Sequence, residues 1–250
     1  RVLQNVSVEL AARALNVVIG PNGTGKSSLL KAVAGLVPSA GVVSFNGRVL
    51  GTPSAKSEWI AYMQQDIGPT SSLTVLEVVL LGRLRQLGFS VPRSYRTEAM
   101  EMLEHLGVGN LAARTLPELS GGQRQLVYLA QSLFRRPKIL LLDEPTAALD
   151  LRHQLLVIDA VRSYARVNNS VVIAAMHDLN LCARFSDRVL CLSNGSIFAD
   201  GSPQDVLTSG NIETMYRVQT RIIHDEDGQF AITPIAAVSY EKEEIAHAAE

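Results

Sequence analysis

The feature that most constrains this chain is a glycine-rich octapeptide between a short apolar run and a helical stretch. Its residues are Gly20-Pro21-Asn22-Gly23-Thr24-Gly25-Lys26-Ser27, which match the pattern GxxxxGK[ST]. Residues 15–19 before it are apolar except for Asn16, as in a buried strand, and residues 26–36 after it have helical spacing. This order of strand, glycine turn and helix, with further apolar runs that alternate with helical stretches, predicts an α/β fold with a mostly parallel sheet.

The octapeptide predicts a site for nucleotide phosphates. Glycines let the backbone turn tightly so that successive N–H groups point at phosphate oxygens, and the helix that begins there adds the positive end of its dipole. We expect Lys26 to reach the β- and γ-phosphates and Ser27 to ligate Mg²⁺. By itself, the octapeptide does not distinguish ATP from GTP.

Two carboxylates follow a second apolar run. Residues 139–142 are Ile-Leu-Leu-Leu, and Asp143 and Glu144 come directly after them. We expect Asp143, at the tip of a buried strand, to hold Mg²⁺ beside the phosphates, and Glu144 to act as general base on the attacking water. The structural alternative is that the two acids cap the following turn. A phosphate loop on the same chain favours the catalytic interpretation.

A third motif, Leu119-Ser120-Gly121-Gly122-Gln123, comes just ahead of a predicted helix over residues 121–134. Ser120 suits the N-cap position, and the paired glycines leave backbone N–H groups exposed, which makes a second surface for phosphate. One γ-phosphate hardly needs both surfaces from one molecule. The motif therefore predicts two chains arranged head to tail, each completing the site of the other.

The octapeptide, LSGGQ at 119–123 and LLLDEP at 140–145, in this order and spacing, resemble the ABC ATPase family over residues 1 to about 225. The resemblance implies ATP and Mg²⁺ as cofactors and the P-loop ABC ATPase fold. That fold has a mostly parallel core sheet, an N-terminal antiparallel β region and a helical subdomain inserted at about 68–135. We expect the ABC ATPase domain over 1–225 and a C-terminal extension, partly flexible, over 226–250.

The resemblance also implies roles for single residues. Gln65 matches the glutamine that contacts Mg²⁺ or water and senses the membrane subunit, and His177 matches the switch histidine at the γ-phosphate. Taken alone, His177 would more readily be structural, but Asp178 beside it and the apolar run 171–175 before it favour the functional role. The implied catalytic residues are Glu144, His177 and Gln65, and the implied Mg²⁺ ligands are Ser27, Gln65 and Asp143. The implied ATP-binding residues are Gly20, Pro21, Asn22, Gly23, Thr24, Gly25, Lys26, Ser27, Ser28, Ser120, Gly121, Gly122, Gln123 and Asp150, the last in a loop that communicates across the dimer.

The chain departs from the family pattern in three places. No aromatic residue precedes Phe45, although the family usually has one upstream that stacks on adenine, so we expect that residue in a preceding segment. Arg13-Ala14 stand where the family often has Gly-Glu, and Ser28 stands where Thr is commoner. None of these changes affects the residues implied in hydrolysis.

The organisation of the chain favours a free-standing importer subunit. No apolar run has the length of a membrane helix, residues 27–119 lack the heptads of the DNA-repair relatives, and the cassette occurs once. The stretches Asp150-Leu151-Arg152-His153-Gln154-Leu155 and His177-Asp178-Leu179-Asn180-Leu181 resemble ATPases of the iron–siderophore, haem and vitamin B12 importers. That resemblance implies a prokaryotic host, an ATPase homodimer, two permease subunits and, indirectly, a substrate-binding protein.

The implied location is peripheral, at the cytoplasmic face of the inner membrane. Gln65 and residues 73–79 would form a groove for a cytoplasmic helix of the permease. The alternative is a soluble ABC ATPase that acts on nucleic acid or on another protein complex. A formal net charge of −1 argues against a general nucleic-acid binder, so no nucleic-acid partner is expected. The transported solute does not touch the ATPase, and no residue encodes it.

Smaller patterns predict the remaining elements. Hairpins are expected around Asn46-Gly47, Asn194-Gly195 and Asp227-Gly228. Strands are expected over 41–48, 59–64 and 171–175, helices over 151–167 and from 203 to 207, and a solvated helix or frayed end from Tyr240. Cys182 and Cys191 make neither a disulfide framework nor a metal-ligand spacing, so we expect reduced thiols.

Overall fold

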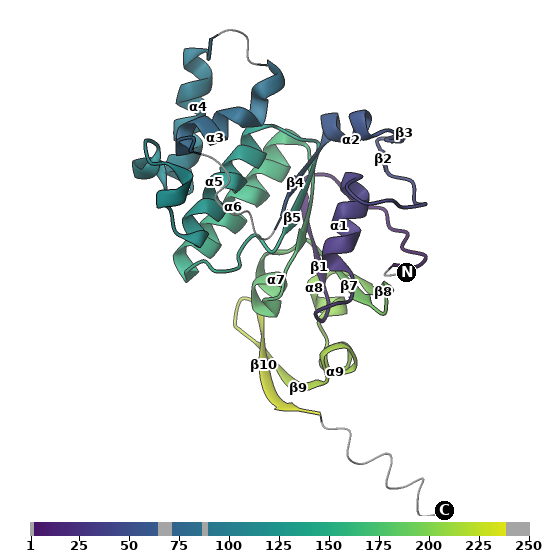
Figure 1. The fold of residues 1–250 in the computed structure, drawn as a ribbon. Helices are drawn as coiled ribbons and strands as arrows, with labels where there is room; N and C mark the ends of the chain where they lie inside the picture. The colour runs from purple at the N-terminus through teal and green to yellow at the C-terminus, as the bar shows by residue number, and fades with distance from the viewer. Residues whose placement is uncertain (1–2, 65–71, 87–89, 239–250) are drawn as a thin grey trace, which may run out of the picture. The chain divides into compact units, whose positions relative to one another are not determined.

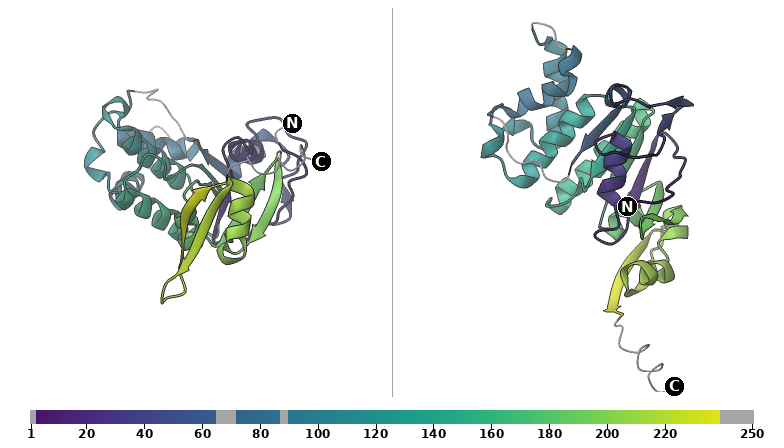
Figure 2. Two further views of the ribbon diagram at one scale, coloured as in Figure 1. Left: turned by 90° about the horizontal axis from the view of Figure 1, so that it is seen from below. Right: turned by 45° about the vertical axis from the view of Figure 1, so that its right-hand side comes forward.

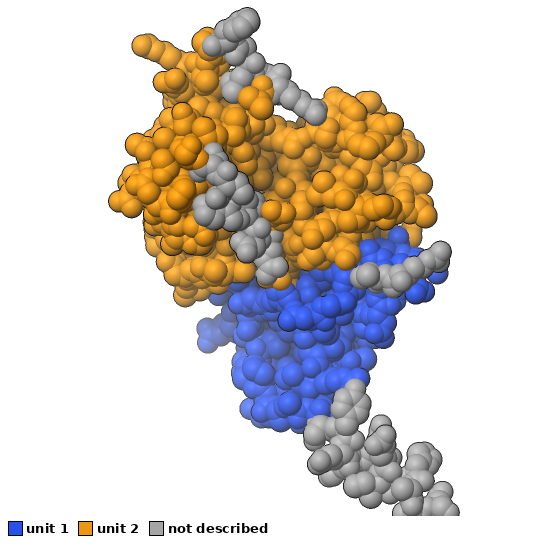
Figure 3. All heavy atoms as spheres, viewed as in Figure 1, with its two compact units in different colours: residues 1–6, 17–26, 177–250 blue, residues 7–16, 27–176 orange. Residues whose placement is uncertain are grey.

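The computed structural model describes residues 3–64, 72–86 and 90–238 (Figure 1). The chain divides into two compact units, which Figure 3 colours separately. The smaller unit comprises residues 1–6, 17–26 and 177–250, and the larger unit comprises residues 7–16 and 27–176. Strand β1 (Ala14–Ile19) contributes its first three residues to the larger unit and its last three to the smaller one.

A parallel sheet forms the core of the larger unit. Strands β4 (Ile60–Met63), β5 (Ile139–Asp143) and β6 (Val171–Ala175) pair in that order, and both pairings are parallel. Every residue of β5 and β6 is buried, as expected for strands covered on both faces. The start of β1 follows β6, where the Asn16 amide donates to the Val172 carbonyl at 3.0 Å. This sheet confirms the predicted α/β class with a mostly parallel core.

Between β4 and β5 the described residues are mainly helical. The elements are α3 (Val75–Leu80), η1 (Leu81–Gln86), α4 (Arg93–His105), η2 (Gly109–Leu111), η3 (Leu116–Glu118) and α5 (Gly121–Phe134). Thr74 caps α3, because its hydroxyl accepts from the Glu77 N–H while the Glu77 carboxylate accepts from the Thr74 N–H. Several apolar residues of these helices, such as Val79 and Leu103, are fully buried. The helical character of this interval agrees with the predicted insertion, whose bounds as a subdomain stay a prediction.

The region before β4 differs in detail from the sequence prediction. Helix α1 (Lys26–Ala34) ends two residues early, because Gly35 takes a positive φ of 77° and closes the helix. The hairpin around Asn46-Gly47 is confirmed by β2 (Ser44–Phe45) and β3 (Arg48–Val49). The long strand predicted over 41–48 is wrong, since only two residues pair on each side of the turn.

Helix α2 (Pro53–Trp59) is absent from the sequence prediction. Thr52 starts it, since the Thr52 hydroxyl accepts from the Ala55 N–H at 3.1 Å and Pro53 occupies the first helical position. Trp59 was expected in a strand but ends this helix, and β4 begins at Ile60. The Thr-Pro pair is the signal that identifies this helix.

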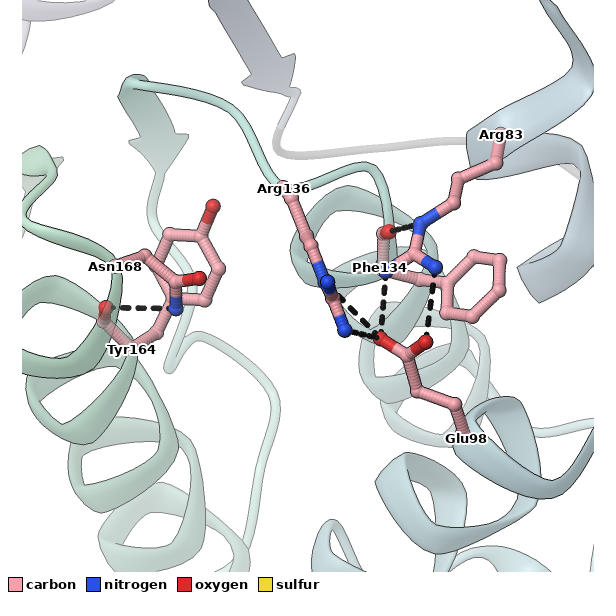
Figure 4. Close-up of polar contacts among 6 residues, drawn as sticks. All are labelled: Arg83, Glu98, Phe134, Arg136, Tyr164 and Asn168. Atoms are coloured by element: carbon pink, nitrogen blue, oxygen red, sulfur yellow. Dashed lines mark hydrogen bonds and ion pairs between the residues drawn. The ribbon is translucent and has the colours of Figure 1, made fainter. Parts of the chain in front are cut away.

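A buried arginine joins three of the helical elements, as Figure 4 shows. The Arg83 side chain in η1 is 4% exposed and forms a forked ion pair with Glu98 of α4, at 2.5 and 2.8 Å. Its Nε donates to the carbonyl of Phe134 at 2.6 Å, and its guanidinium lies 4.1 Å from the centre of the Phe134 ring. Arg136 adds a second cation to Glu98 at 2.6 Å. Burial opposes ionisation of Glu98, but these hydrogen bonds outweigh it and hold the pKa of Glu98 below its usual range.

Replacing Arg83 by Met is expected to lower the free energy of unfolding by about 3 kcal/mol, because Glu98 loses its buried partner and keeps only Arg136. Because the pKa of Glu98 is lower when folded than when unfolded, this stabilisation is present at neutral pH and is lost in acid. In urea unfolding, the difference in free energy of unfolding between wild type and Arg83→Met should therefore shrink as the pH falls below about 4. The exposed Arg96 of α4 supplies the control, since Arg96→Met should change stability by less than about 0.5 kcal/mol.

Helix α6 (Leu151–Asn168) completes the larger unit and runs one residue beyond the predicted range. The N-cap is Asp150, and Asn169 ends the helix in a left-handed conformation with φ of 51°. In Figure 4 the Tyr164 carbonyl accepts a hydrogen bond from the Asn168 amide in the last turn of α6, at 3.1 Å. The Tyr164 hydroxyl donates to the carbonyl of Pro137 at 2.7 Å, and this contact joins α6 to the segment that enters β5.

The smaller unit is built on antiparallel hairpins. Strands β7 (Arg188–Ser193) and β8 (Ser196–Gly201) pair around Asn194-Gly195, as predicted, and β7 lies beside the end of β1 in the hydrogen-bonded order. Strands β9 (Val218–His224) and β10 (Phe230–Ala237) form the hairpin predicted around Asp227-Gly228. The smaller unit also contains the helices α7 (Leu179–Phe185), α8 (Pro203–Val206) and α9 (Ser209–Tyr216). Both views in Figure 2 show α9 beside β9.

Asn180 attaches the C-terminal hairpin to α7. Its side-chain amide donates to the Ile232 carbonyl at 3.2 Å, and its side-chain oxygen accepts from the Ile232 N–H at 2.7 Å. The β9–β10 hairpin spans the predicted boundary between the ATPase domain over 1–225 and the C-terminal extension over 226–250. That boundary stays a prediction, and the predicted tail from Tyr240 lies outside the described residues.

Both cysteines are buried in the smaller unit, and neither forms a disulfide. Burial raises the pKa of the Cys191 thiol to about 12 and the pKa of Cys182 further, so both thiols are protonated at neutral pH. Within the described part of the chain, no helix combines the length and apolar character needed to cross a membrane.

Candidate functional site

The glycine-rich loop connects β1 to α1. Gly20, Gly23 and Gly25 take positive φ values of 152°, 81° and 102°. All three values fall in the positive range that disfavours other residues, and a Cβ atom at Gly20 would lie 2.2 Å from the Leu192 carbonyl oxygen. The backbone at residues 20–25 therefore depends on glycine, as a loop that presents N–H groups to an anion requires.

Lys26 is buried at the end of this loop, with 6% of its surface exposed. Its ammonium group donates to the carbonyls of Gly20 at 2.7 Å and Pro21 at 3.1 Å. The Thr24 hydroxyl also donates to the Pro21 carbonyl, at 2.9 Å. Backbone carbonyls of the loop thus hold the Lys26 ammonium group. Lys26 is also the first residue of α1, and the N-terminus of a helix favours anions.

In the larger unit, Asp143 at the end of β5 gathers two hydroxyl groups. Ser27, the second residue of α1, donates to Asp143 Oδ1 at 2.9 Å. Tyr62 of β4 donates to Asp143 Oδ2 at 3.0 Å. Burial and the carboxylate together raise the pKa of Tyr62 well above its usual range, so the phenol stays a donor. The structure therefore brings together the predicted Mg²⁺ ligands Ser27 and Asp143. Tyr62 is a second hydrogen-bond donor to the same carboxylate.

This oxygen-only group fits Mg²⁺. The ion prefers hard oxygen ligands, and proteins usually supply one or two of them while phosphates and water supply the rest. Ser27 and Asp143 would provide two oxygens 2.9 Å apart. No cluster of three or more His, Cys, Asp or Glu side chains that could hold a metal occurs among the described residues.

Glu144 follows Asp143 in a left-handed conformation, with φ of 52°. Its N–H donates to the Ala175 carbonyl of β6 at 3.0 Å. Its carbonyl accepts from the side-chain amide of Gln125 at 2.7 Å and from the N–H of Ala147 at 3.2 Å. The backbone of this residue is thus fixed from three directions while its side chain remains half-buried.

The signature residues 119–123 form the start of α5. The Ser120 hydroxyl accepts from the Gln123 N–H at 3.2 Å, and the Gln123 side-chain oxygen accepts from the Ser120 N–H at 3.0 Å. This reciprocal cap confirms Ser120 as the N-cap of α5. Gly121 is exposed at the helix N-terminus, and Gly122 packs against the Ala148 carbonyl, which would lie 3.0 Å from an added Cβ atom.

Asp150 is the N-cap of α6. Its carboxylate accepts from the backbone N–H of His153 at 2.8 Å and contacts His153 Nδ1 at 2.8 Å. These hydrogen bonds lower the pKa of Asp150, so it stays ionised at neutral pH. The cap accounts for an acid at this position, and its expected role across a dimer stays a prediction.

The remaining predicted residues are placed as follows. His177 is exposed in the segment between β6 and α7, and Asp178 after it caps α7 by accepting from the N–H groups of Asn180 and Leu181. Gln65 lies outside the described residues. The loop at 20–26 and His177 belong to the smaller unit, whereas Ser27, Asp143 and Glu144 belong to the larger.

Tyr62 and Gln125 were missed by the sequence prediction. Tyr62 occurs in a predicted strand, and its only signal is a hydroxyl close to the strand's end. Gln125 interrupts the apolar face of α5 and is almost fully buried, at 9% exposure. A polar side chain at an apolar helix position indicates a buried hydrogen bond, but the sequence does not identify its partner.

Comparisons with known proteins agree with this arrangement. The family model described as ABC transporter matches residues 3–147. Among curated relatives, the achromobactin transport ATP-binding protein CbrD of Dickeya dadantii is 36% identical over 229 residues, which cover 90% of this chain and 85% of CbrD. The hemin import ATP-binding protein HmuV of Streptomyces coelicolor is 39% identical over 93% of this chain and 84% of HmuV. The cobalamin import ATP-binding protein BtuD of Halobacterium salinarum is 37% identical over 94% of this chain and 60% of BtuD.

Solved structures give the same assignment. An inward-facing metal-chelate type ABC transporter matches with a TM-score of 0.76 and 27% identity, over 94% of this chain and 91% of the matched chain. The dimeric cassette MJ0796, in a post-hydrolysis state with ADP and Pi, matches with a TM-score of 0.73 and 26% identity, over 81% of this chain and 90% of its own. With the phosphate loop, the capped LSGGQ helix and the Asp143–Glu144 strand end in place, this chain belongs to the ABC transporter family.

Proposed function

We propose that this chain is the ATP-binding and ATP-hydrolysing subunit of a prokaryotic ABC importer for a metal chelate. The observation that carries the proposal is the match, over about nine-tenths of the chain, to ATP-binding proteins named for siderophore, hemin and cobalamin import. The stretches at 150–155 and 177–181, which carry the finer resemblance in the sequence, support the same subclass.

In this proposal, residues 20–28 bind the phosphates of ATP. Backbone N–H groups of the glycine loop receive the phosphate oxygens, and Lys26 exchanges its carbonyl contacts for the β- and γ-phosphates. Ser27 and Asp143 hold Mg²⁺, which neutralises charge that develops on the phosphates. Tyr62 keeps the Asp143 carboxylate oriented toward Ser27.

Hydrolysis then requires a base and a charge stabiliser. Glu144 takes a proton from the attacking water, and the water oxygen bonds to the γ-phosphorus as the bond to ADP breaks. His177 donates a hydrogen bond to the γ-phosphate, and Gln65 helps to orient the water. These three roles follow from the family motifs at those positions.

A second copy of the chain completes each site. Ser120, Gly121, Gly122 and Gln123 of one chain close over the γ-phosphate held by the other, and Asp150 lies in the loop that links the two sites. The exposed start of α5 supports this role because the N-terminus of a helix favours an anion. The matched dimeric cassette MJ0796 shows that a relative of this fold forms dimers.

The dimer is proposed to work at the cytoplasmic face of the inner membrane, bound to two permease subunits. Gln65 and residues 73–79 would receive the permease's cytoplasmic helix, and a substrate-binding protein would deliver the chelate from outside. ATP-driven closing and opening of the dimer would move the permease between its two states.

The test is transport by a reconstituted complex. The chain, its cognate permease and the binding protein should be assembled in liposomes and supplied in turn with iron–siderophore, haem and cobalamin. We expect one of the three to stimulate ATP hydrolysis at least about threefold and to accumulate inside. A Lys26→Ala complex should do neither, because its phosphate contacts are lost.

Two outcomes would contradict the proposal. Stimulation by none of the chelates, with uptake of an unrelated solute, would overturn the substrate class. Recovery of the chain from cells with DNA or ribosomes rather than with membrane proteins would favour the soluble alternative over transport.

A further inference from the structure

We infer that Gln125 is a positioning residue for hydrolysis, which holds the backbone of Glu144 so that its carboxylate faces the water. The inference rests on the proposed function, because it assigns a role in the same reaction. Gln125 lies in α5, two residues after the signature motif, with only 9% of its surface exposed. Its amide nitrogen donates to the Glu144 carbonyl at 2.7 Å.

Glu144 needs such support because of its backbone. It takes φ of 52°, a left-handed conformation that residues other than glycine seldom adopt and that surrounding contacts must enforce. Three hydrogen bonds do so. The Glu144 N–H donates to Ala175, and the Glu144 carbonyl uses both of its lone pairs, one for the Ala147 N–H and one for Gln125.

Gln125 is the single side chain among these three partners. The contacts to Ala175 and Ala147 are made by backbone atoms, so they belong to β6 and to the turn after β5. The hydrogen bond from Gln125 connects this turn to a different element, the helix that begins with LSGGQ. Only this contact can be removed by substitution without altering the strand or the turn.

Helix α5 contacts the same turn a second time. Gly122 approaches Ala148 so closely that a Cβ atom would lie 3.0 Å from the Ala148 carbonyl and 3.1 Å from a methyl of Leu149. Ala148 is itself left-handed, with φ of 56°. Both strained residues of the segment 144–148 therefore lie against α5, one at Gln125 and one at Gly122. The signature helix and the proposed base are held together within one chain.

The competing explanation is that Gln125 only satisfies a buried carbonyl. A purely structural role predicts that its loss lowers thermal stability and weakens ATP binding along with turnover. A positioning role predicts a fall in kcat with an unchanged KM, because neither Gln125 nor the Glu144 carbonyl is proposed to touch ATP. The split between kcat and KM therefore separates the two explanations.

The experiment is steady-state ATP hydrolysis by the full chain with Mg²⁺, comparing Gln125→Met with wild type. Methionine keeps the length and approximate volume of glutamine but donates no hydrogen bond. We expect kcat to fall about tenfold, which corresponds to about 1.4 kcal/mol, while KM stays within about twofold. The matched control is Gln131→Met, on the same helix at a half-buried position, which should keep wild-type kcat.

A second variant covers the case in which Gln125→Met folds poorly. Gln125→Asn keeps the amide but is one methylene shorter, so it cannot reach the Glu144 carbonyl without a shift of the helix. It should show the same fall in kcat with unchanged KM. In a Glu144→Gln background, Gln125→Asn should cause no further loss of turnover, because two residues acting through one group are not additive.

Each result is decisive. A kcat equal to that of the Gln131→Met control overturns the inference while the proposed function stands. A parallel loss of melting temperature, ATP binding and turnover in both Gln125 variants also overturns it, in favour of the structural role. A wild-type chain that hydrolyses no ATP would overturn the proposed function and this inference with it.

Discussion

Replacing Glu144 by Gln should reduce ATP turnover by at least about a hundredfold, because an amide cannot accept the proton of the attacking water. The substitution preserves size, and the three hydrogen bonds that fix residue 144 use backbone atoms and the Gln125 side chain. The Ser27–Asp143 pair is also untouched. ATP binding should therefore survive, and the variant should accumulate as an ATP-bound dimer because the step that opens the dimer is blocked.

Two measurements check this result. Phosphate release gives the turnover, and size-exclusion chromatography with ATP and Mg²⁺ gives the dimer fraction. Glu101→Gln, which makes the same chemical change on an exposed position of α4, should behave as wild type in both. Normal hydrolysis by Glu144→Gln would remove Glu144 from the role of base, and a variant that stays monomeric with ATP would contradict the proposed order of events.

Mixing two inactive variants should restore activity if each site is shared between two chains. Lys26→Ala removes the phosphate-binding ammonium group, and Ser120→Arg obstructs the start of α5, where Ser120 is exposed. Each variant alone should retain less than about 1% of wild-type turnover. In a head-to-tail heterodimer, one site combines both defects, and the other combines an intact loop with an intact signature.

The expected recovery of turnover follows from the fraction of heterodimers and the number of working sites in each. Random mixing makes half of the dimers heterodimers, and each of these has one working site of two, so about a quarter of wild-type turnover should return if sites act independently. Titrating one variant into the other gives the curve, and mixing two preparations of Lys26→Ala is the control. Absence of any recovery would show that loop and signature of one chain serve the same site, or that the two sites must both be intact. A Glu144→Gln/Ser120→Arg chain mixed with Lys26→Ala separates these two cases, because it should form an ATP-bound dimer without turnover only if the sites are shared.

Motifs that act through consecutive residues were predictable from the sequence. The phosphate loop works through glycine backbones and two neighbouring side chains, so its eight residues carry their own geometry. The cap of α5 is equally local, because Ser120 and Gln123 satisfy one another three residues apart. Hairpins at Asn46-Gly47 and Asn194-Gly195 follow from turn chemistry.

Element bounds were less predictable where a local signal competes with an apolar pattern. Trp59 is a residue type that is common in strands, but the helix that Thr52 starts continues through it. The strand expected over 41–48 pairs at only two residues on each side of its turn. In these cases hydrogen bonds decided the bounds, and side-chain type did not.

What the sequence by itself determined is the family, the mostly parallel α/β fold and the local chemistry of its three motifs. Only the tertiary structure decided that Tyr62 reaches Asp143, 81 residues away, that Gln125 supports Glu144, and that Arg83 is buried between Glu98 and Phe134. These contacts depend on how strands and helices pack, and packing brings together residues whose separation in the chain carries no signal. In the sequence each of them is an ordinary polar residue, and its partner becomes visible only when both elements are in place.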